Sequence, residues 1–377
     1  MSERLCVKKG VSFCLDVEQA VLDLSNAITQ PDMTYVTFFC SSDYDLDALA
    51  TALDEAFDCP VIGCTTAGEI TAEDGYLTQT LVGFSVSSDE IFIHPQLIES
   101  LDKFDSNTAE KLTNNLRFEL KLSTNFDPSH SFGLLLIDGM SMQEENVVAS
   151  LYEQMVGMPI VGGSAGDDLK FNKAYVYWQG KFIYNAAVYT LFETTLPFKT
   201  FQTQHFEPTE DRLVITESDC ETRTVSEING VPAAQEYADT IGVDLDNLTP
   251  QIFADYPVML KIGNQYYVRS IQKKNPDGSL TFYCAIQDGL VLRIGHSKNL
   301  IENLSEQLST LHNQVPNIKF ILGCDCILRR LELQEKYAVN EFKQALKGTE
   351  FIGFNTYGEQ SNSIHMNHTL TGIALGE

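Results

Sequence analysis

One short pattern occurs three times along the chain and limits what the chain can fold into. The pattern is an apolar run, a glycine, three or four small or polar residues, a second glycine and an acid. Its copies span residues 61–69, 160–167 and 351–359. An apolar run of strand length precedes each copy, at residues 36–40, 132–137 and 318–322, and apolar residues at helical spacing lie in between. Three copies in the same order indicate repetition of a strand–helix–strand–glycine-turn unit.

The repetition extends beyond the first and third turns. Residues 79–86 and 368–375 both contain Thr-Leu-x-Gly at nearly the same distance after the turn, which indicates an ancestral duplication. In this alignment His365 lies opposite Tyr76. The turns match neither the dinucleotide fingerprint nor the phosphate loop. We therefore expect their glycines to serve backbone geometry and packing, with ligand contact at a domain junction as the alternative.

Length and pattern predict an α/β (α+β) protein with two domains of mixed sheets flanked by helices. A chain of 377 residues exceeds a usual single core. Pro197 ends a strand, and after it the pattern changes to short strands with Asn-Gly and Asp-Gly turns. We predict one domain over 1–197, with two repeat units. The second covers 198–377, with the third unit and an inserted β segment.

Composition excludes several classes of protein. The formal net charge of −27 argues against nucleic acid or an anionic membrane as partner, because both need a basic surface. No apolar run approaches the ~20 residues needed to span a bilayer, and the N-terminus has no signal-peptide core. The nine cysteines are scattered in or beside apolar runs, as in reduced cytosolic proteins. We expect a cytoplasmic protein, and a homodimer is one of the assemblies we consider.

Histidines give the clearest candidates for a metal site. His365 and His368 lie between the third glycine turn and the final strand, where the first copy has Tyr76 and Gln79. The fold therefore manages without histidine there, which favours a site specific to the C-terminal part. His205 directly follows the predicted boundary. Neutral imidazole ligates metals, including haem iron, although a structural hydrogen-bonded histidine is the alternative at each position.

Two further groups of side chains carry potential chemistry. Arg329 and Arg330 follow a cysteine-containing strand, and their guanidinium groups suit carboxylates or haem propionates; ion pairs with glutamates on the next helix are the alternative. Cys64 or Cys324 could act as a nucleophile. The sequence shows no cysteine–histidine pairing, and buried inert thiols are the favoured interpretation.

With these motifs the chain resembles the FIST family, a two-part sensory module of FIST N and FIST C. Residues 61–70 and 160–167 resemble the two signatures of the N-terminal part. Residues 225–233 and 353–359 resemble those of the C-terminal part. The resemblance covers nearly the whole chain, and it implies a ligand-binding sensor in signalling rather than an enzyme. In the last signature we carry Gly353 and Tyr357 over as cofactor-binding positions.

A narrower resemblance is carried by residues 204–208, 326–330 and 365–372, which are similar to the NosP group. That group implies a sensor that binds haem b and nitric oxide and regulates a histidine kinase or a cyclic-di-GMP enzyme. Under this reading His365 or His205 is the iron ligand, and Arg329 or Arg330 pairs with the propionates. The chain shows no output segment of its own, so a partner would deliver the signal. The alternative is a FIST sensor for a small metabolite such as an amino acid, which would use the turn amides and an arginine.

Overall fold

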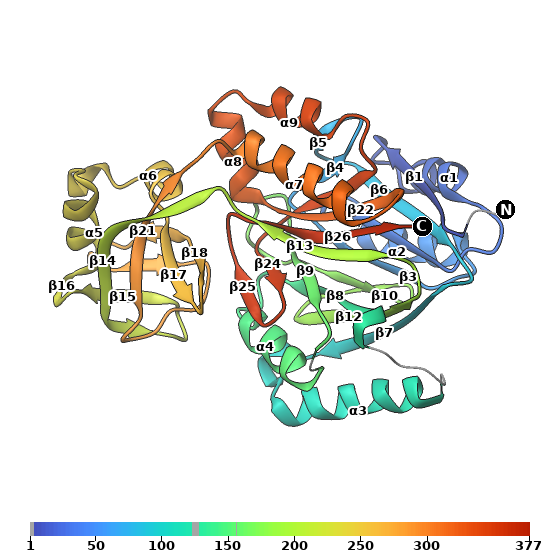
Figure 1. Ribbon diagram of the computed structural model, residues 1–377, viewed down its shortest axis with the longest axis horizontal. Coiled ribbons are helices and arrows are strands. Elements are labelled where there is room, and N and C mark those ends of the chain that lie inside the picture. Colours follow the sequence, from blue (N-terminus) through green and yellow to red (C-terminus); the bar gives the residue numbers. More distant parts are fainter. Residues whose placement is uncertain (1–3, 123–127, 156) are drawn as a thin grey trace. The chain divides into compact units, whose positions relative to one another are not determined.

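The computed structural model describes residues 4–122, 128–155 and 157–377, which form two compact units (Figure 1). The larger unit comprises Met1–Gln202, Ser305–His365 and Leu370–Glu377. The smaller unit comprises Thr203–Leu304 and Met366–Thr369. These units group the third repeat with the first two. They are therefore a different division of the chain from the predicted sequence domains, 1–197 and 198–377, which stay a prediction.

The larger unit is built from three copies of one order of elements. The first copy contains β1 (Cys6–Ser12), α1 (Val17–Ile28), β2 (Tyr35–Cys40), α2 (Leu46–Ala56), β3 (Val61–Thr65), β4 (Glu69–Thr71), β5 (Gly75–Leu77) and β6 (Leu81–Ser87). The second contains β7 (Ile91–Glu99), η1 (Leu101–Lys103), α3 (Ser106–Leu122), η2 (Pro128–His130), β8 (Ser131–Asp138), α4 (Glu144–Gln154), β9 (Ile160–Ala165), β10 (Val176–Trp178), β11 (Lys181–Ile183) and β12 (Ala186–Thr194). The third contains β13 (Phe198–Thr203), α7 (Leu300–Gln314), β22 (Ile318–Cys326), α8 (Ile327–Glu335), α9 (Val339–Leu346), β23 (Phe351–Thr356), β24 (Glu359–Ser361), β25 (Ile364–Met366) and β26 (Leu370–Gly376).

Strand pairing confirms the predicted repetition and the mixed α/β fold class. In each copy one central strand pairs in parallel with the strand that enters the glycine turn, and antiparallel with the last strand of the copy. The central strands are β2, β8 and β22; their parallel partners are β3, β9 and β23; their antiparallel partners are β6, β12 and β26. Parallel pairing needs a crossover connection, which the intervening helices supply.

The three copies exchange their hairpins in a ring. The hairpin β4–β5 of the first copy pairs with β23 of the third. The hairpin β10–β11 of the second pairs with β3 of the first, and β24 of the third pairs with β9 of the second. Each copy thus completes the six-stranded sheet of another copy, and no copy has a full sheet by itself.

The sheets bury a shared apolar core. Phe39 of the first copy stacks on Phe354 of the third with ring centroids 4.2 Å apart, and Phe84 approaches Phe320 at 4.4 Å. The helices pack one apolar face onto the sheets. In α1, for example, the buried side chains recur at helical spacing, and the Asp16 carboxylate caps the first turn by accepting from Gln19 N. Among the described residues, no helix has the length and apolarity that crossing a membrane requires.

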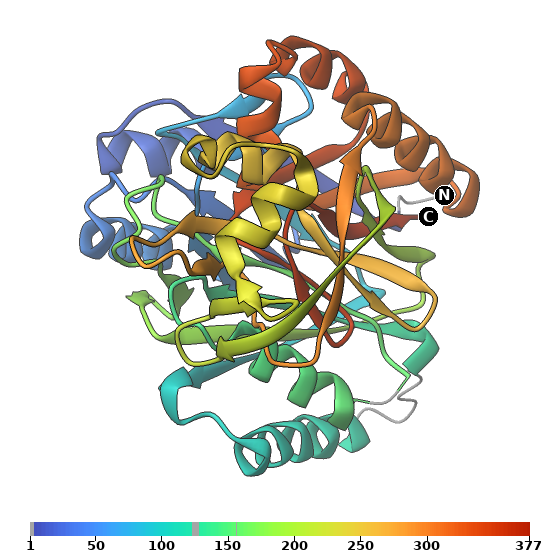
Figure 2. The same ribbon diagram turned by 90° about the vertical axis from the view of Figure 1, so that its left-hand side faces the viewer.

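The smaller unit is a separate β-rich body inserted into the third copy. Its elements are β14 (Phe206–Asp219), β15 (Thr224–Ile228), β16 (Val231–Pro232), α5 (Ala233–Ile241), η3 (Leu245–Asn247), α6 (Pro250–Asp255), β17 (Val258–Ile262), β18 (Gln265–Arg269), β19 (Ile271–Lys274), β20 (Leu280–Phe282) and β21 (Val291–Ser297). Strands β14 and β21 run side by side (Figure 2). The predicted Asn-Gly turn joins β15 to β16 with positive φ at both Asn229 and Gly230.

One predicted hairpin needs correction. The sequence Gln179-Gly180 predicts a hairpin turn that joins a strand over residues 174–178 to a strand over 186–192. The structure has this turn, but it connects β10 to the three-residue strand β11. The next strand, β12, lies in another sheet between β7 and β8. The break between β11 and β12 is hard to see in the sequence because apolar residues lie on both sides of it. It lies at Asn185, which has a left-handed conformation with φ 51°.

The three glycine turns are bonded to one another through their backbones. Asn355 N donates to Gly68 O at 2.7 Å, and Ala67 N donates to Asn355 O at 3.0 Å. Gly166 N donates to Thr65 O at 3.0 Å, and Ser164 N donates to the carbonyl of the third turn at 2.8 Å. These amides are therefore used inside the fold, which supports the structural interpretation of the turns.

Glu69 is the acid of the first turn and is completely buried. Its two carboxylate oxygens accept hydrogen bonds from the hydroxyls of Thr66 and Thr80, each at 2.5 Å. Burial raises the pKa of Glu69 to about 8, and the hydroxyls oppose this shift only in part. The carboxyl group is thus protonated near neutral pH in the folded chain and ionised in the unfolded chain.

The raised pKa of Glu69 predicts a loss of stability as pH rises. Between the ordinary value of 4.5 and about 8 the folded state binds one more proton than the unfolded state. The free energy of unfolding should therefore fall with pH by at most about 1.4 kcal/mol per pH unit in this window. Chemical denaturation from pH 5 to 9 measures the slope. Glu69→Gln should flatten it, and an unchanged slope in that variant would contradict this assignment.

A second prediction concerns the end of α8. Ala338 N donates to Leu333 O and Tyr337 N donates to Gln334 O, which is the Schellman arrangement. Tyr337 is left-handed with φ 55°, at the position where glycine is favoured, and its side chain is 92% exposed. Tyr337→Gly should therefore raise the free energy of unfolding by about 1 kcal/mol. Tyr337→Ala removes the ring but keeps the strain, so it should give no such gain in the same denaturation experiment.

Candidate functional site

A strained loop lies at the carboxyl end of β9 in the larger unit. Asp168, Leu169 and Phe171 all have positive φ, at 55°, 63° and 52°. Residues held this way cost about 1–3 kcal/mol each and concentrate at ligand and switch sites. Leu169 and Phe171 also expose large apolar side chains. In α/β sheets the carboxyl ends of parallel strands are where ligands bind, so this loop marks a candidate site.

Side chains from all three copies hold the loop. Asp168 Oδ2 accepts from Ser41 Oγ, Ser42 N and Ser42 Oγ, each at 2.8 Å, just after β2 ends. Tyr357 follows β23; its hydroxyl donates to Asp167 and accepts from Leu169 N at 2.9 Å. The Tyr357 ring stacks on that of Phe171 with centroids 5.0 Å apart. Burial, together with the Asp167 hydrogen bond, raises the pKa of Tyr357, so it remains a neutral donor.

His365 lies beside this region, in β25. It is the middle residue of a three-residue strand, and Tyr76 has the same place in β5 of the first copy, as the alignment predicted. Gln360 Nε2 donates to His365 Nδ1 at 3.0 Å and to Ser164 Oγ at 2.9 Å. A Cβ on Gly358 would come within 2.2 Å of His365 Cε1. The second glycine of the pattern therefore gives the imidazole its room.

Gln360 also carries an unusual acceptor. Its side chain is fully buried, and its Oε1 has no hydrogen-bond partner within the described part of the chain. A buried polar atom without a partner costs about 1–3 kcal/mol, so such atoms need an explanation. At the equivalent place after the first glycine turn the chain has Ile70, which is apolar. The third copy therefore differs from the first by a buried amide beside a buried imidazole.

The two arginines are engaged inside the larger unit. Arg329 Nε pairs with Asp325 Oδ1 at 2.6 Å, and neither side chain is exposed. Arg330 Nη1 donates to the carbonyls of Ala67 and Leu77 and to Asn355 Oδ1, each at 3.2 Å. These bonds attach the exchanged hairpin of the first copy to α8. A haem propionate would have to displace one of them.

The remaining sequence candidates have other surroundings. Gly353 lies within β23, where a Cβ would come within 2.1 Å of the Gly323 carbonyl oxygen, so close packing of the strands requires glycine. His205 is in the smaller unit, where its ring is tilted by 43° against that of Phe206 with centroids 4.3 Å apart. Cys64 and Cys324 are buried, and burial raises the pKa of both thiols. A buried neutral thiol is a poor nucleophile, which disfavours the cysteine-enzyme hypothesis.

Sequence reasoning missed two parts of this site. The loop that follows Asp167, residues 168–171, carries no motif, and its conformation depends on contacts with two other copies. Gln360 could have been found, because a polar residue replaces Ile70 of the first copy at a position that the repeat predicts to be buried. The contacts of Ser41 and Ser42 with Asp168 join residues far apart in the chain and required the structure.

Comparison with known proteins finds two domains of one family in the chain. The FIST N domain model matches residues 34–231, and the FIST C domain model matches residues 233–362. The chain is also similar to "Uncharacterized protein MJ1623" of Methanocaldococcus jannaschii. The two are 22% identical over 353 residues, a region covering 83% of this chain and 67% of that relative. FIST domains have a sensory, ligand-binding role in signalling. The two domain models together match most of the chain, which therefore belongs to the FIST family.

Proposed function

We propose that the larger unit binds the signal ligand of this FIST protein at the carboxyl ends of β9 and β23. The observation that carries the proposal is the buried Gln360 amide, whose Oε1 has no partner among the described residues. A ligand can remove the cost of this acceptor in two ways: it can donate a hydrogen bond to Oε1, or it can bind His365 Nε2, so that Nδ1 carries the proton and donates to Oε1 after the amide rotates. The strained loop at Asp168–Phe171 supports the same location, because ligand binding can be coupled to relaxation of its strained backbone.

The more specific proposal is that the ligand is haem b, held through His365. An iron-ligating histidine donates a hydrogen bond from the N–H of its other ring nitrogen to an acceptor, which fixes the orientation of the ring. Gln360 now donates to Nδ1, which places the ring proton on Nε2. A half-turn of the amide would present Oε1 to Nδ1–H and satisfy the buried oxygen. The pair thus fits a haem-ligating histidine, and bound haem would supply an iron that takes up nitric oxide.

His205 is the second haem candidate. It is buried in the smaller unit beside Phe206, and the NosP resemblance supports it rather than its geometry. The same resemblance supports a histidine kinase or a cyclic-di-GMP enzyme as the partner that receives the signal. In this scheme the protein chain contributes recognition and a change of loop conformation, and the partner contributes the output.

The alternative is a small metabolite such as an amino acid. Its ammonium or amide N–H groups could donate to Gln360 Oε1. The structure differs from the simplest version of this idea, because the turn amides and both arginines already have partners inside the fold. The ligand would therefore be recognised by side chains of the third copy and of the loop.

An absorption spectrum after haem reconstitution tests the haem proposal. Wild type, His365→Ala, His205→Ala and His296→Ala should be compared, since His296 is an exposed histidine and serves as the control. We expect a saturable, stoichiometric Soret band that shifts with nitric oxide, persists in His296→Ala and is lost in His365→Ala. Loss only in His205→Ala would move the ligand to the smaller unit. Absence of a band above that of an unrelated protein would overturn the haem proposal.

The metabolite alternative is tested by thermal shift with the twenty amino acids. A ligand that binds only the folded state at 100 times its Kd stabilises the fold by about 2.7 kcal/mol. We expect one amino acid to raise the Tm of the wild type and to lose this effect in Gln360→Leu. An equal rise in both proteins would place the ligand elsewhere.

A further inference from the structure

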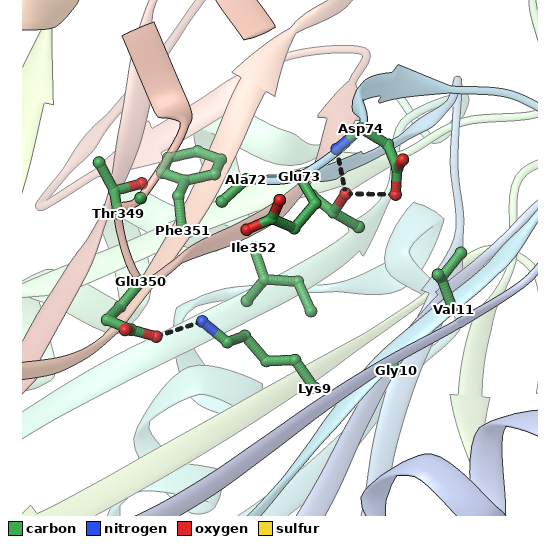
Figure 3. Close-up of a pocket in the computed structure, with 12 residues that line it drawn as sticks. Lys9, Gly10, Val11, Ala72, Glu73, Asp74, Thr349, Glu350, Phe351 and Ile352 are labelled. Carbon is green, nitrogen blue, oxygen red and sulfur yellow. Dashed lines mark hydrogen bonds and ion pairs between the residues drawn. The ribbon is translucent and has the colours of Figure 1, made fainter. Parts of the chain in front are cut away.

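A cavity opens on the larger unit, beside the segment that follows the first glycine turn and the segment that leads into the third. It has a volume of about 280 Å³ and is formed by β1, the residues that follow β4 and those that precede β23 (Figure 3). The register explains why these segments meet. Ile352 pairs with Thr71, and Ala72 N donates to Phe351 O at 3.2 Å. The residues that follow β4 therefore lie opposite those that precede β23.

The charges of this cavity are unbalanced. Glu73, Asp74 and Glu350 contribute three carboxylates, and Lys9 contributes one ammonium, which pairs with Glu350 at 2.5 Å. The Asp74 carboxylate accepts from Thr71 Oγ1 at 3.0 Å, and the Glu73 side chain is exposed. The cavity therefore has two carboxylates more than its own ammonium can neutralise, and it favours a cation.

The floor of the cavity is apolar. Ala72, Phe351 and Ile352 are buried, and Val11 adds a further aliphatic side chain. In Figure 3 Ile352 lies between Lys9 and Glu73. A ligand with charged ends and a methylene chain matches a floor of this kind, because the methylenes bury apolar surface while the ends reach carboxylates.

A second cavity shares Asp74 with the first, and among the described residues its lining adds the ammonium of Lys343 and no further carboxylate. It has a volume of about 440 Å³ and is lined by Asp74, Gln334, Tyr337, Val339, Asn340 and Lys343. Asp74 lines both cavities, and the strained Tyr337 presents its exposed ring to the second one. An ammonium can bind over an aromatic face as well as beside a carboxylate.

We propose that these cavities form a binding site for a linear organic polycation, a di- or polyamine. One ammonium lies between Glu350 and Glu73, the methylene chain crosses Ile352, and the next ammonium reaches Asp74. Longer polyamines extend toward Tyr337. A metal ion fits less well, because among the described residues these three carboxylates do not gather as the ligands of one ion would. The site is independent of the ligand proposed at Gln360.

Isothermal titration at low ionic strength tests this site with butylamine, 1,4-diaminobutane and spermidine. We expect saturable one-site binding that strengthens from the monoamine to the diamine and to spermidine. Glu73→Gln should weaken the affinity for spermidine roughly five-fold, because loss of one partly exposed ion pair changes an affinity by about this factor. Lys9→Met removes the competing ammonium and should strengthen binding by a similar factor, a gain that misfolding cannot produce.

Glu55→Gln is the matched control, because Glu55 is exposed on α2 and its replacement changes the net charge by the same amount. Equal weakening in Glu55→Gln and Glu73→Gln would mean general attraction of cations to an acidic chain and would overturn the site. Weaker spermidine binding in Lys9→Met would do the same, because removing a competing cation from a site for ammonium groups should not weaken it. Saturable binding of Mg²⁺ alone, with no binding of amines, would replace the polyamine by a metal ion.

Discussion

The mutual hydrogen bonding of the three glycine turns is the constraint on which the larger unit depends. Each turn satisfies backbone groups of another copy, as Gly68 and Asn355 do, and each hairpin completes another copy's sheet. A single copy would leave a sheet edge and several turn amides without partners, which is costly when buried. The three copies must therefore fold together, and the inserted smaller unit has to leave and re-enter the third copy without breaking this ring.

A related constraint applies to the ionisable groups buried near the turns. Arg330 lies where segments from different copies meet and donates to the carbonyls of Ala67 and Leu77, which are distant in sequence. Glu69 is held by Thr66 and Thr80 of its own copy. Removing one partner from such a network costs more than the network contributes as a whole, because it leaves a polar group without compensation. Arginines that resemble ligand-binding residues in the sequence thus serve here to attach one copy to another.

The residues of the candidate site lie at positions where the three copies differ in sequence. The first copy has Ile70 and Tyr76 at the positions that Gln360 and His365 occupy in the third. The fold tolerates an apolar and an aromatic residue there, so the amide and the imidazole are not needed for architecture. The second copy differs in its loop, which adopts left-handed conformations at Asp168 and Leu169 that no glycine relieves. Divergence inside a repeat is therefore a better guide to the site than the shared glycine pattern.

The sequence by itself determined the repeat, the strand and helix order within each copy, the mixed α/β class and the equivalence of His365 with Tyr76. These are local properties, because apolar periodicity and glycine turns depend on residues close together in the chain. Tertiary structure alone decided the hairpin exchange, the burial of Arg329 against Asp325, and the contacts of Asp168 with Ser41 and Ser42. These features depend on how the three copies pack against one another. Hydrogen bonds between distant segments produce no periodic pattern in the sequence from which they could be predicted.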